Sequence, residues 1–245
     1  STEPPTPANP TLPIIATFNL TGSEDVLDVA CYRGAEIAVA EINAKGGVLG
    51  RPIELVRVDT KSDQARTPTI ASEALRAHPG AVAGLGYCDS SYVLDIGPAF
   101  QRAGIPFVTP GATDASLPDR LGPNFFLACY SDDAQAEAMA EYAYTQLGLR
   151  RVALWADEQM DYTRSVADRF DRSFTARGGA VQRWTYPQDT PSYASQIEAF
   201  RHASPPFDAI YSASTPAEGE VQVGQIRAAG IQVPLLSGDG WDDPK

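Results

Sequence analysis

The chain has 245 residues, of which 43% are hydrophobic and 20% are charged, and its formal net charge is -12. This composition is typical of a globular protein that buries one large core or two smaller ones. The negative charge disfavours nucleic acids and anionic membrane surfaces as partners, and no apolar run approaches the ~20 residues of a membrane span.

The first eleven residues, 1–11, form a proline-rich leader that we expect to be disordered. The leader has neither the basic start nor the apolar centre of a signal peptide. Its composition fits the remnant of a cleaved signal, a tether to a lipid anchor or an artificial extension, and it does not choose among these three.

From residue 12 onward, short apolar runs alternate with helical patterns. Helices are indicated where apolar residues recur at spacings of three and four before a glycine, as at Ala35, Ala38, Val39 and Ile42 before Gly46. This alternation predicts parallel sheets with helices on both faces. The nine predicted strands lie at 13–20, 53–59, 81–85, 106–109, 125–128, 151–156, 181–186, 208–212 and 234–236.

The alternation is interrupted at residues 109–125, where a long loop shows no helical pattern. After this loop a strand and a long helix begin a new series. We interpret the break as the passage from an N-terminal α/β lobe, 12–128, to a second α/β lobe, 129–245. In such sheets the strand ends that carry functional residues share one edge.

Three polar loops follow predicted strands, and each of them is ambiguous by itself. Ser90 and Ser91 stand between a strand and a helix, where a hydroxyl either caps the helix or binds an anion. Gly111 and Thr113 follow the next strand, in what is either an ordinary loop or a ligand contact. Asp239 lies between two glycines, as a plain turn or as a carboxylate for an ammonium group. Together, these groups are complementary to a zwitterion such as an amino acid.

An enzyme is disfavoured by the residues that the chain lacks. Ser90 is not in a G-x-S-x-G turn, and the only histidines, His78 and His202, do not follow predicted strands, which disfavours a Ser-His-Asp triad. Two histidines without a cysteine pair at metal-ligand spacing also disfavour zinc. The enzyme alternative is a metal-dependent hydrolase that uses Asp239, Asp242 and Asp243. We therefore predict no catalysis and no cofactor.

Four stretches resemble the periplasmic substrate-binding proteins of branched-chain amino acid ABC transporters, of the leucine/isoleucine/valine-binding type. The stretches are GAEIAVAEINAKGGVLGRPIELVRVD (34–59), GLGYCDSS (84–91), FQRAGIPFVTPGATDASL (100–117) and AAGIQVPLLSGDGWDD (228–243). The resemblance implies two doubly wound parallel α/β lobes of the type I periplasmic-binding-protein-like fold, which close on a ligand by a hinge. Because family members are longer, it also implies that the C-terminal completion of the first lobe is missing from this chain.

The resemblance assigns a role to each residue of a ligand site. Ser90 matches a serine that binds the ligand carboxylate, and Thr113 matches a threonine that contacts both ends of a zwitterion. Gly111 matches a position whose carbonyl accepts from the ammonium. Tyr162 matches a tyrosine of the second lobe, and Asp239 falls where the family has an acid against the ammonium. The implied ligand-binding residues are Ser90, Gly111, Ala112, Thr113, Tyr162 and Asp239.

The chain departs from the family at the side-chain pocket, which makes a plain leucine pocket doubtful. Leu27 and Thr215 stand where aromatic residues are common, Asp89 stands beside the pocket, and Trp241 follows the acid. An acid at this place suits a polar or cationic ligand, whereas a large aromatic floor suits an aromatic one. The candidate side-chain pocket is formed by Leu27, Cys88, Asp89, Thr215 and Trp241.

The chain has three cysteines, Cys31, Cys88 and Cys129, which is no disulfide framework. The first-lobe disulfide of the resembling family is not reproduced. We nevertheless predict that Cys31 approaches Cys88, because both lie near the start of helices that face the cleft.

The resemblance implies a monomeric, periplasmic or extracytoplasmic solute-binding protein, with or without a lipid anchor. This protein would deliver an amino acid or a similar small carboxylate to a membrane ABC permease, without contacting nucleic acid. The alternatives are an aromatic acid, an amide or a urea-like molecule as ligand, and a sensory receptor domain on the same fold.

Overall fold

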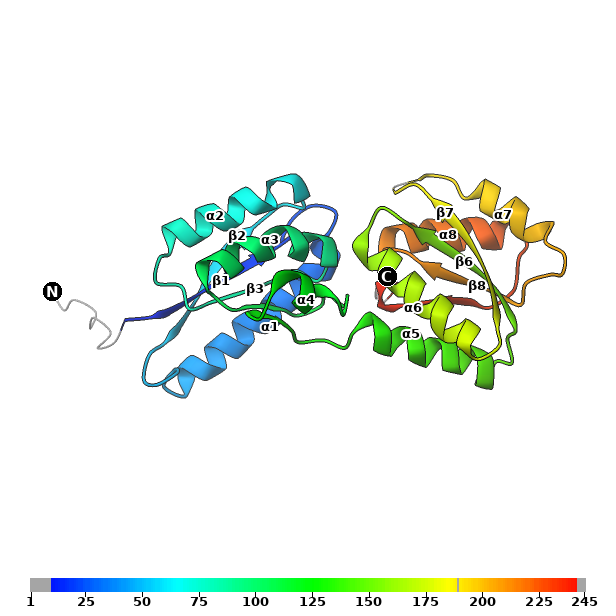
Figure 1. The fold of residues 1–245 in the computed structure, drawn as a ribbon. Coiled ribbons are helices and arrows are strands. Elements are labelled where there is room, and N and C mark those ends of the chain that lie inside the picture. The colour runs from blue at the N-terminus through cyan, green and yellow to red at the C-terminus, as the bar shows by residue number, and fades with distance from the viewer. Residues whose placement is uncertain (1–9, 189, 242–245) are drawn as a thin grey trace. The chain divides into compact units, whose positions relative to one another are not determined.

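The computed structural model describes residues 10–188 and 190–241 (Figure 1). The chain divides into two compact units, Ser1–Cys129 and Tyr130–Lys245. Most of the predicted leader at 1–11 lies outside the described residues, as do Asp242 and Asp243 of the proposed hydrolase site.

The first unit is built on a five-stranded parallel sheet with the strand order β2-β1-β3-β4-β5. Its strands are β1 (Leu12–Phe18), β2 (Ile53–Asp59), β3 (Ala83–Gly86), β4 (Phe107–Thr109) and β5 (Phe125–Leu127). Its helices are α1 (Asp25–Ala44), α2 (Thr67–Ala77), α3 (Ser90–Ala103) and α4 (Leu117–Leu121), with a 3-10 turn at Gln64–Arg66. Because β3 pairs with both β1 and β4, the loops that follow these three strands are neighbours.

Helices cover both faces of this first sheet. Successive residues of a strand point to opposite faces, so Ile15 and Ala16 of β1 belong to different clusters. Ile15 packs with buried residues of α2, α3 and α4, whereas Ala16 and Phe18 pack with Tyr32 of α1. The first unit is thus doubly wound, as the sequence predicts.

The second unit contains a four-stranded parallel sheet with the order β7-β6-β8-β9. Its strands are β6 (Arg151–Asp157), β7 (Ala180–Tyr186), β8 (Ala209–Ala213) and β9 (Leu235–Ser237). Its helices are α5 (Asp132–Glu141), which continues as a π-helix over Tyr142–Gln146, α6 (Asp161–Ala176), α7 (Ala194–Arg201) and α8 (Pro216–Ala228), with a 3-10 turn at Asp239–Trp241.

The second sheet is also covered on both faces (Figure 1). Leu154 of β6 packs in the cluster that contains α5 and α6 residues, including Phe170. The neighbouring Trp155 packs in the cluster that contains Ile197 of α7 and Ile226 of α8. The alternation along one strand therefore separates two cores, and the predicted α/β architecture is confirmed in this unit as well.

All nine predicted strands are present, each within two residues of its predicted bounds. The prediction of a helix-free stretch at 109–125 is wrong, because α4 forms at Leu117–Leu121. This helix has a proline in its first turn and ends at Gly122, but it is too short for a hydrophobic period to show. The helix predicted around Ala35 is confirmed as α1, although its buried residues are Asp28 and Tyr32 and Ile42 is 37% exposed.

Candidate functional site

The turn after β3 holds its backbone in an unusual conformation. Tyr87 has a φ of 53°, in the left-handed region that bulky residues rarely adopt. Its carbonyl oxygen accepts a hydrogen bond from the Thr109 hydroxyl at 2.6 Å, and that same hydroxyl oxygen accepts from the Ala112 backbone N–H at 2.9 Å. Thr109 thereby ties the loop after β3 to the loop after β4.

The structure brings Ser90 together with the loop that carries Thr113. Ser90 is the first residue of α3 and is 0% exposed, while Thr113 is 2% exposed. The Ser90 hydroxyl oxygen accepts a hydrogen bond from the backbone N–H of Asp114 at 3.4 Å. The Ser90 hydroxyl and the N-terminal end of the 14-residue α3 therefore lie against the loop that carries the buried Thr113.

The N-cap of α3 is Asp89 rather than Ser90. One carboxylate oxygen of Asp89 accepts hydrogen bonds from the backbone N–H groups of Ser91 at 2.7 Å and Tyr92 at 3.3 Å. Capping explains a buried aspartate at this position without any ligand. A contact of Asp89 with a cationic ligand stays a prediction, and the Ser90 hydroxyl is not engaged in capping the helix.

Cys88 and Gly111 pack directly against each other. A Cβ atom added at Gly111 would lie 2.8 Å from both the Cβ and the Sγ of Cys88, so glycine is needed for this close approach. On the other side of the same loop, the carbonyl of Ala112 accepts a hydrogen bond from the Cys129 thiol at 3.3 Å. Cys88, Gly111 and Ala112 thus lie where the loops after β3 and β4 meet at the start of α3, as does Ser90. We call this place the junction.

Asp28 is a central residue of this junction that the sequence analysis did not identify. It is buried in the first turn of α1, and its carboxylate accepts hydrogen bonds from the backbone N–H groups of Asn19 at 2.6 Å and Cys88 at 2.8 Å. It therefore joins the loops that follow β1 and β3. Its position four residues before the buried Tyr32 was a signal in the sequence, because both lie on one helical face. Leu27, the preceding residue, is half-buried.

Burial raises the pKa of Asp28 from 3.8 to about 6, although the two backbone N–H groups pull it down. As the pH rises, the unfolded chain therefore loses this proton at a lower pH than the folded chain does. We expect the free energy of unfolding to fall as the pH rises from about 4 to about 6, by on the order of 3 kcal/mol from this group alone.

Urea unfolding of the wild type and of Asp28→Asn across this pH range measures that contribution. The asparagine variant is destabilised by the lost acceptor, but the slope that comes from Asp28 is absent. Identical slopes in the two proteins would show that the pKa of Asp28 is not raised.

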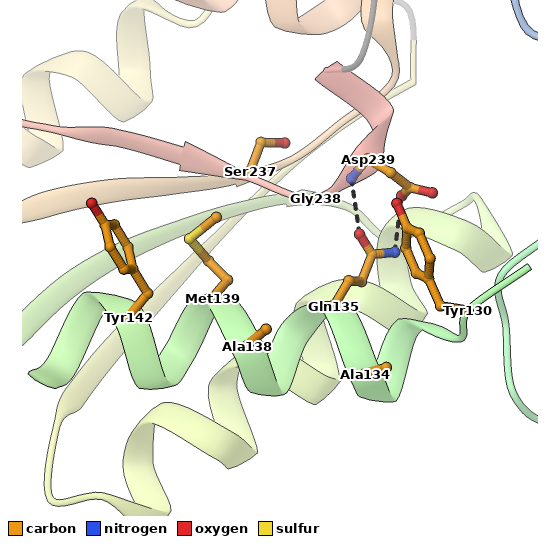
Figure 2. Close-up of a pocket in the computed structure, with 9 residues that line it drawn as sticks. All are labelled: Tyr130, Ala134, Gln135, Ala138, Met139, Tyr142, Ser237, Gly238 and Asp239. Atoms are coloured by element: carbon orange, nitrogen blue, oxygen red, sulfur yellow. Dashed lines mark hydrogen bonds between the residues drawn. The ribbon is translucent and has the colours of Figure 1, made fainter. Parts of the chain in front are cut away.

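In the second unit, the structure brings Tyr162 and Asp239 together with Gln135. The Tyr162 hydroxyl and the Gln135 amide both donate to the same Asp239 carboxylate oxygen, each at 2.8 Å. The backbone N–H of Asp239 donates in turn to the Gln135 side-chain oxygen at 2.8 Å, as the dashed lines in Figure 2 show in part. No pattern in the sequence points to Gln135, because its role depends on a partner 104 positions away.

The electrostatics of this cluster keep Tyr162 as a neutral hydroxyl. Burial, followed by the nearby charge of Asp239, raises its pKa well above the usual value of a tyrosine. The hydroxyl donates to Asp239 and accepts from the backbone N–H of Gly240 at 2.7 Å. The second Asp239 oxygen accepts no hydrogen bond from the residues at 10–188 and 190–241. One carboxylate oxygen is thus oriented by the protein while the other can accept from a ligand.

An open pocket of about 530 Å³ lies along α5 beside this cluster (Figure 2). It belongs to the second unit alone and is lined by Tyr130, Ala134, Gln135, Ala138, Met139, Tyr142, Ser237, Gly238 and Asp239. Asp239 and Gln135 lie at one end, and the apolar Met139 and Tyr142 lie toward the other (Figure 2). Of the predicted ligand-binding residues, only Asp239 lines this pocket.

Thr215 and Trp241 have structural roles in the second unit. Thr215 is the N-cap of α8 and forms a capping box with Glu218, in which each side chain bonds to the backbone of the other. The Trp241 indole N–H donates to the Ser214 hydroxyl at 2.7 Å, and its ring occupies the space beside Gly219. These contacts account for both residues without assigning them to a side-chain pocket.

Of the three residues of the hydrolase alternative, only Asp239 lies in the described part of the chain. Among residues 10–188 and 190–241, no group of three histidine, cysteine or acidic residues could hold a metal ion. His78 and His202 lie directly after α2 and α7, and the His202 side chain is 81% exposed. A search of the described residues also finds no helix long and apolar enough to cross a bilayer.

Comparison with known proteins gives consistent matches over most of the chain. The chain is 27% identical over 236 residues to the Leu/Ile/Val-binding protein homolog 3 of Brucella melitensis, which covers 95% of this chain and 62% of that protein. It resembles the crystal structure of the leucine-binding protein LivK from Thermotoga maritima with a TM-score of 0.87 and 29% identity, over 96% of this chain and 65% of that one.

A second solved structure is similar to the same extent. It is the branched-chain amino acid transporter substrate-binding protein LivJ from Streptococcus pneumoniae in complex with isoleucine, with a TM-score of 0.84 and 28% identity, over 94% of this chain and 65% of that chain. The chain thus spans somewhat less than two thirds of the length of the relatives it matches.

The family model that matches is described as periplasmic binding protein, and it aligns with residues 14–244. This is a family of binding proteins, in line with the prediction that the chain is not an enzyme. Two doubly wound parallel sheets and a model match over nearly the whole length lead to the same conclusion: the chain belongs to the periplasmic binding protein family.

Proposed function

We propose that the protein is an extracytoplasmic solute-binding protein that captures an amino acid or a related small carboxylate and delivers it to a membrane ABC permease. The observation that most supports this proposal is the buried Ser90 hydroxyl at the N-terminal end of α3, bonded to the loop that carries the buried Thr113. Membership in a family of periplasmic binding proteins supports the location and the absence of catalysis.

The chemistry at Ser90 suits a carboxylate. Seryl and threonyl hydroxyls donate hydrogen bonds, and the first turn of α3 adds backbone N–H groups and the positive end of the helix dipole. Hydrogen bonds to a charged acceptor are worth about 1.5–3 kcal/mol each. The loop of Gly111 and Ala112 lies against Cys88, two residues before Ser90. Its backbone is therefore placed to add contacts to a carboxylate bound at Ser90.

For an amino acid ligand, we assign Asp239 of the second unit as the partner of the ammonium. The oxygen that accepts no hydrogen bond from the described residues provides the acceptor, and the other oxygen is held by Tyr162 and Gln135. Asp239 is thereby oriented before any ligand binds, which lowers the entropic cost of binding.

A second candidate ligand is an aromatic carboxylate, which has no ammonium. The observation that favours it is that Asp239 already receives two hydrogen bonds within its own unit and is therefore stable without a cationic partner. The carboxylate contacts at Ser90 and Thr113 would be the same for both ligand classes, so the two candidates differ only at Asp239.

A thermal-shift screen of the twenty amino acids against aromatic carboxylates, followed by calorimetry, tests the proposal. We expect at least one of these carboxylates to raise the melting temperature. We also expect Ser90→Ala to weaken its binding about tenfold or more, through the loss of one charge-assisted hydrogen bond.

Ser72→Ala is the matched control, because among the described residues the Ser72 hydroxyl donates only to the Pro68 carbonyl within α2, so its loss should not change the affinity. Mass spectrometry of ligand released from freshly purified protein gives independent identification. A Ser90→Ala variant that binds the ligand as tightly as the wild type would remove the carboxylate role of this residue.

A further inference from the structure

We propose that Cys31 and Cys88 form a disulfide that links α1 to the loop carrying Ser90. The two sulfur atoms lie 3.3 Å apart although the residues are 57 positions apart in the sequence. The sequence predicts only that these residues approach each other, and the structure confirms this approach. The disulfide itself goes beyond the proposed function.

The two sulfurs lie close to bonding distance. A disulfide requires the sulfurs to come to about 2.05 Å, so they must approach by little more than 1 Å. Asp28 lies three residues before Cys31, on the same side of α1, and its carboxylate is bonded to the backbone N–H of Cys88 at 2.8 Å. This hydrogen bond holds the helical turn of Cys31 against the loop of Cys88 without help from the sulfurs.

The two thiols are chemically unequal. The Cys88 thiol donates a hydrogen bond to the Cys31 sulfur, which lowers the pKa of Cys31 and raises that of Cys88. The Cys31 sulfur therefore carries negative charge more readily and is the better nucleophile of the pair. Both cysteines are half-buried, so a small oxidant can reach the pair, and Cys88 in addition packs against Gly111.

Oxidation proceeds by thiol–disulfide exchange with a disulfide-bonded oxidant, such as glutathione disulfide or a protein disulfide oxidase. The Cys31 thiolate attacks one sulfur of the oxidant, which breaks that disulfide and releases one thiolate. The Cys88 sulfur then attacks the Cys31 side of the mixed disulfide and releases the second. The two protons lost by Cys31 and Cys88 are taken up by the two released thiolates, so the oxidant is reduced by two electrons.

The bond would rigidify the part of the first unit that carries the carboxylate contacts. Cys88 lies two residues before Ser90 and packs against Gly111. A disulfide to Cys31 therefore connects the loops after β3 and β4 to helix α1. Oxidising compartments favour such bonds, and the proposed extracytoplasmic location provides one. The chemistry of the pair itself does not depend on that location, on the ligand or on transport.

The test is to incubate the purified protein with glutathione disulfide, denature it and alkylate the free thiols. We expect one alkylated thiol, Cys129, and a non-reducing digest in which the Cys31 peptide is linked to the Cys88 peptide. After reduction we expect three alkylated thiols. Because a cross-link over 57 positions restricts the unfolded chain, the oxidised protein should melt several degrees above the reduced protein.

Three variants make the result specific. Cys129→Ser should retain the cross-link and the shift in melting temperature, whereas Cys31→Ser and Cys88→Ser should each lack both. Three free thiols after oxidation, a stable mixed disulfide with glutathione, or a cross-link that contains Cys129 would overturn the proposal. None of these outcomes bears on ligand binding, so failure here leaves the proposed function untouched.

Discussion

Replacing Asp239 by alanine should weaken the binding of an α-amino acid about a hundredfold, on the order of 3 kcal/mol. In the proposed binding mode the ammonium loses its charged partner, and the hydroxyl of Tyr162 and the amide of Gln135 lose the oxygen to which they donate. Isothermal titration calorimetry measures the loss directly. The same substitution should leave the binding of an aromatic carboxylate nearly unchanged, because that ligand has no ammonium.

Asp239→Asn separates the charge from the packing. The amide oxygen of asparagine can still accept from Tyr162 and Gln135, so the cluster is preserved while its charge is removed. We expect this variant to lose most of the affinity for an amino acid as well. Glu220→Gln removes the same charge from an exposed position on α8 and serves as the control. Unchanged affinity in Asp239→Asn would exclude the ammonium role.

Gly86→Ala should destabilise the first unit by about 3 kcal/mol or more. Gly86 pairs with Thr17 across β3 and β1, and a Cβ atom at Gly86 would lie 1.8 Å from the Thr17 carbonyl oxygen. A backbone atom in a parallel ladder cannot move aside as the end of a flexible side chain can. The substitution would therefore separate two central strands directly before the turn that carries Cys88 and Ser90.

Urea unfolding followed by far-ultraviolet circular dichroism measures this loss. Tryptophan fluorescence would miss it, because all three tryptophans, Trp155, Trp184 and Trp241, belong to the second unit. Gly34→Ala is the matched control: its Cβ would meet nothing within 4 Å, and alanine in the interior of α1 should add up to about 1 kcal/mol. Equal unfolding midpoints in the two variants would contradict the prediction.

The order of the strands along the chain was readable from the sequence because each strand is a short apolar run between turn residues. The run Val152–Ala156, for example, is buried on both sides of the sheet, which is the pattern expected for a central parallel strand. The rule that parallel strands present their carboxyl ends at one edge was also sufficient to associate Ser90 with the loop of Thr113. α4 was missed because five residues are too few for a period to appear.

The identity of the cap residue could not be decided from the sequence. Asp89 and Ser90 are both favourable N-cap residues, and they are adjacent. Which of them caps α3 depends on the directions of the Ser91 and Tyr92 N–H groups, and the structure gives this role to Asp89. In α8 the structure likewise gives the cap to Thr215, which forms a capping box with Glu218.

The sequence by itself determined the α/β class, the order of strands and helices, and the loops at which polar residues gather. Only the tertiary structure decided that Asp28 bonds to Cys88, that Cys31 lies 3.3 Å from it, and that Gln135 holds Asp239. The physical reason is that a local pattern records which face of an element is buried. The side chain that contacts this buried face comes from a distant segment of the chain. The position of that side chain is set by the packing of the helices on the sheet.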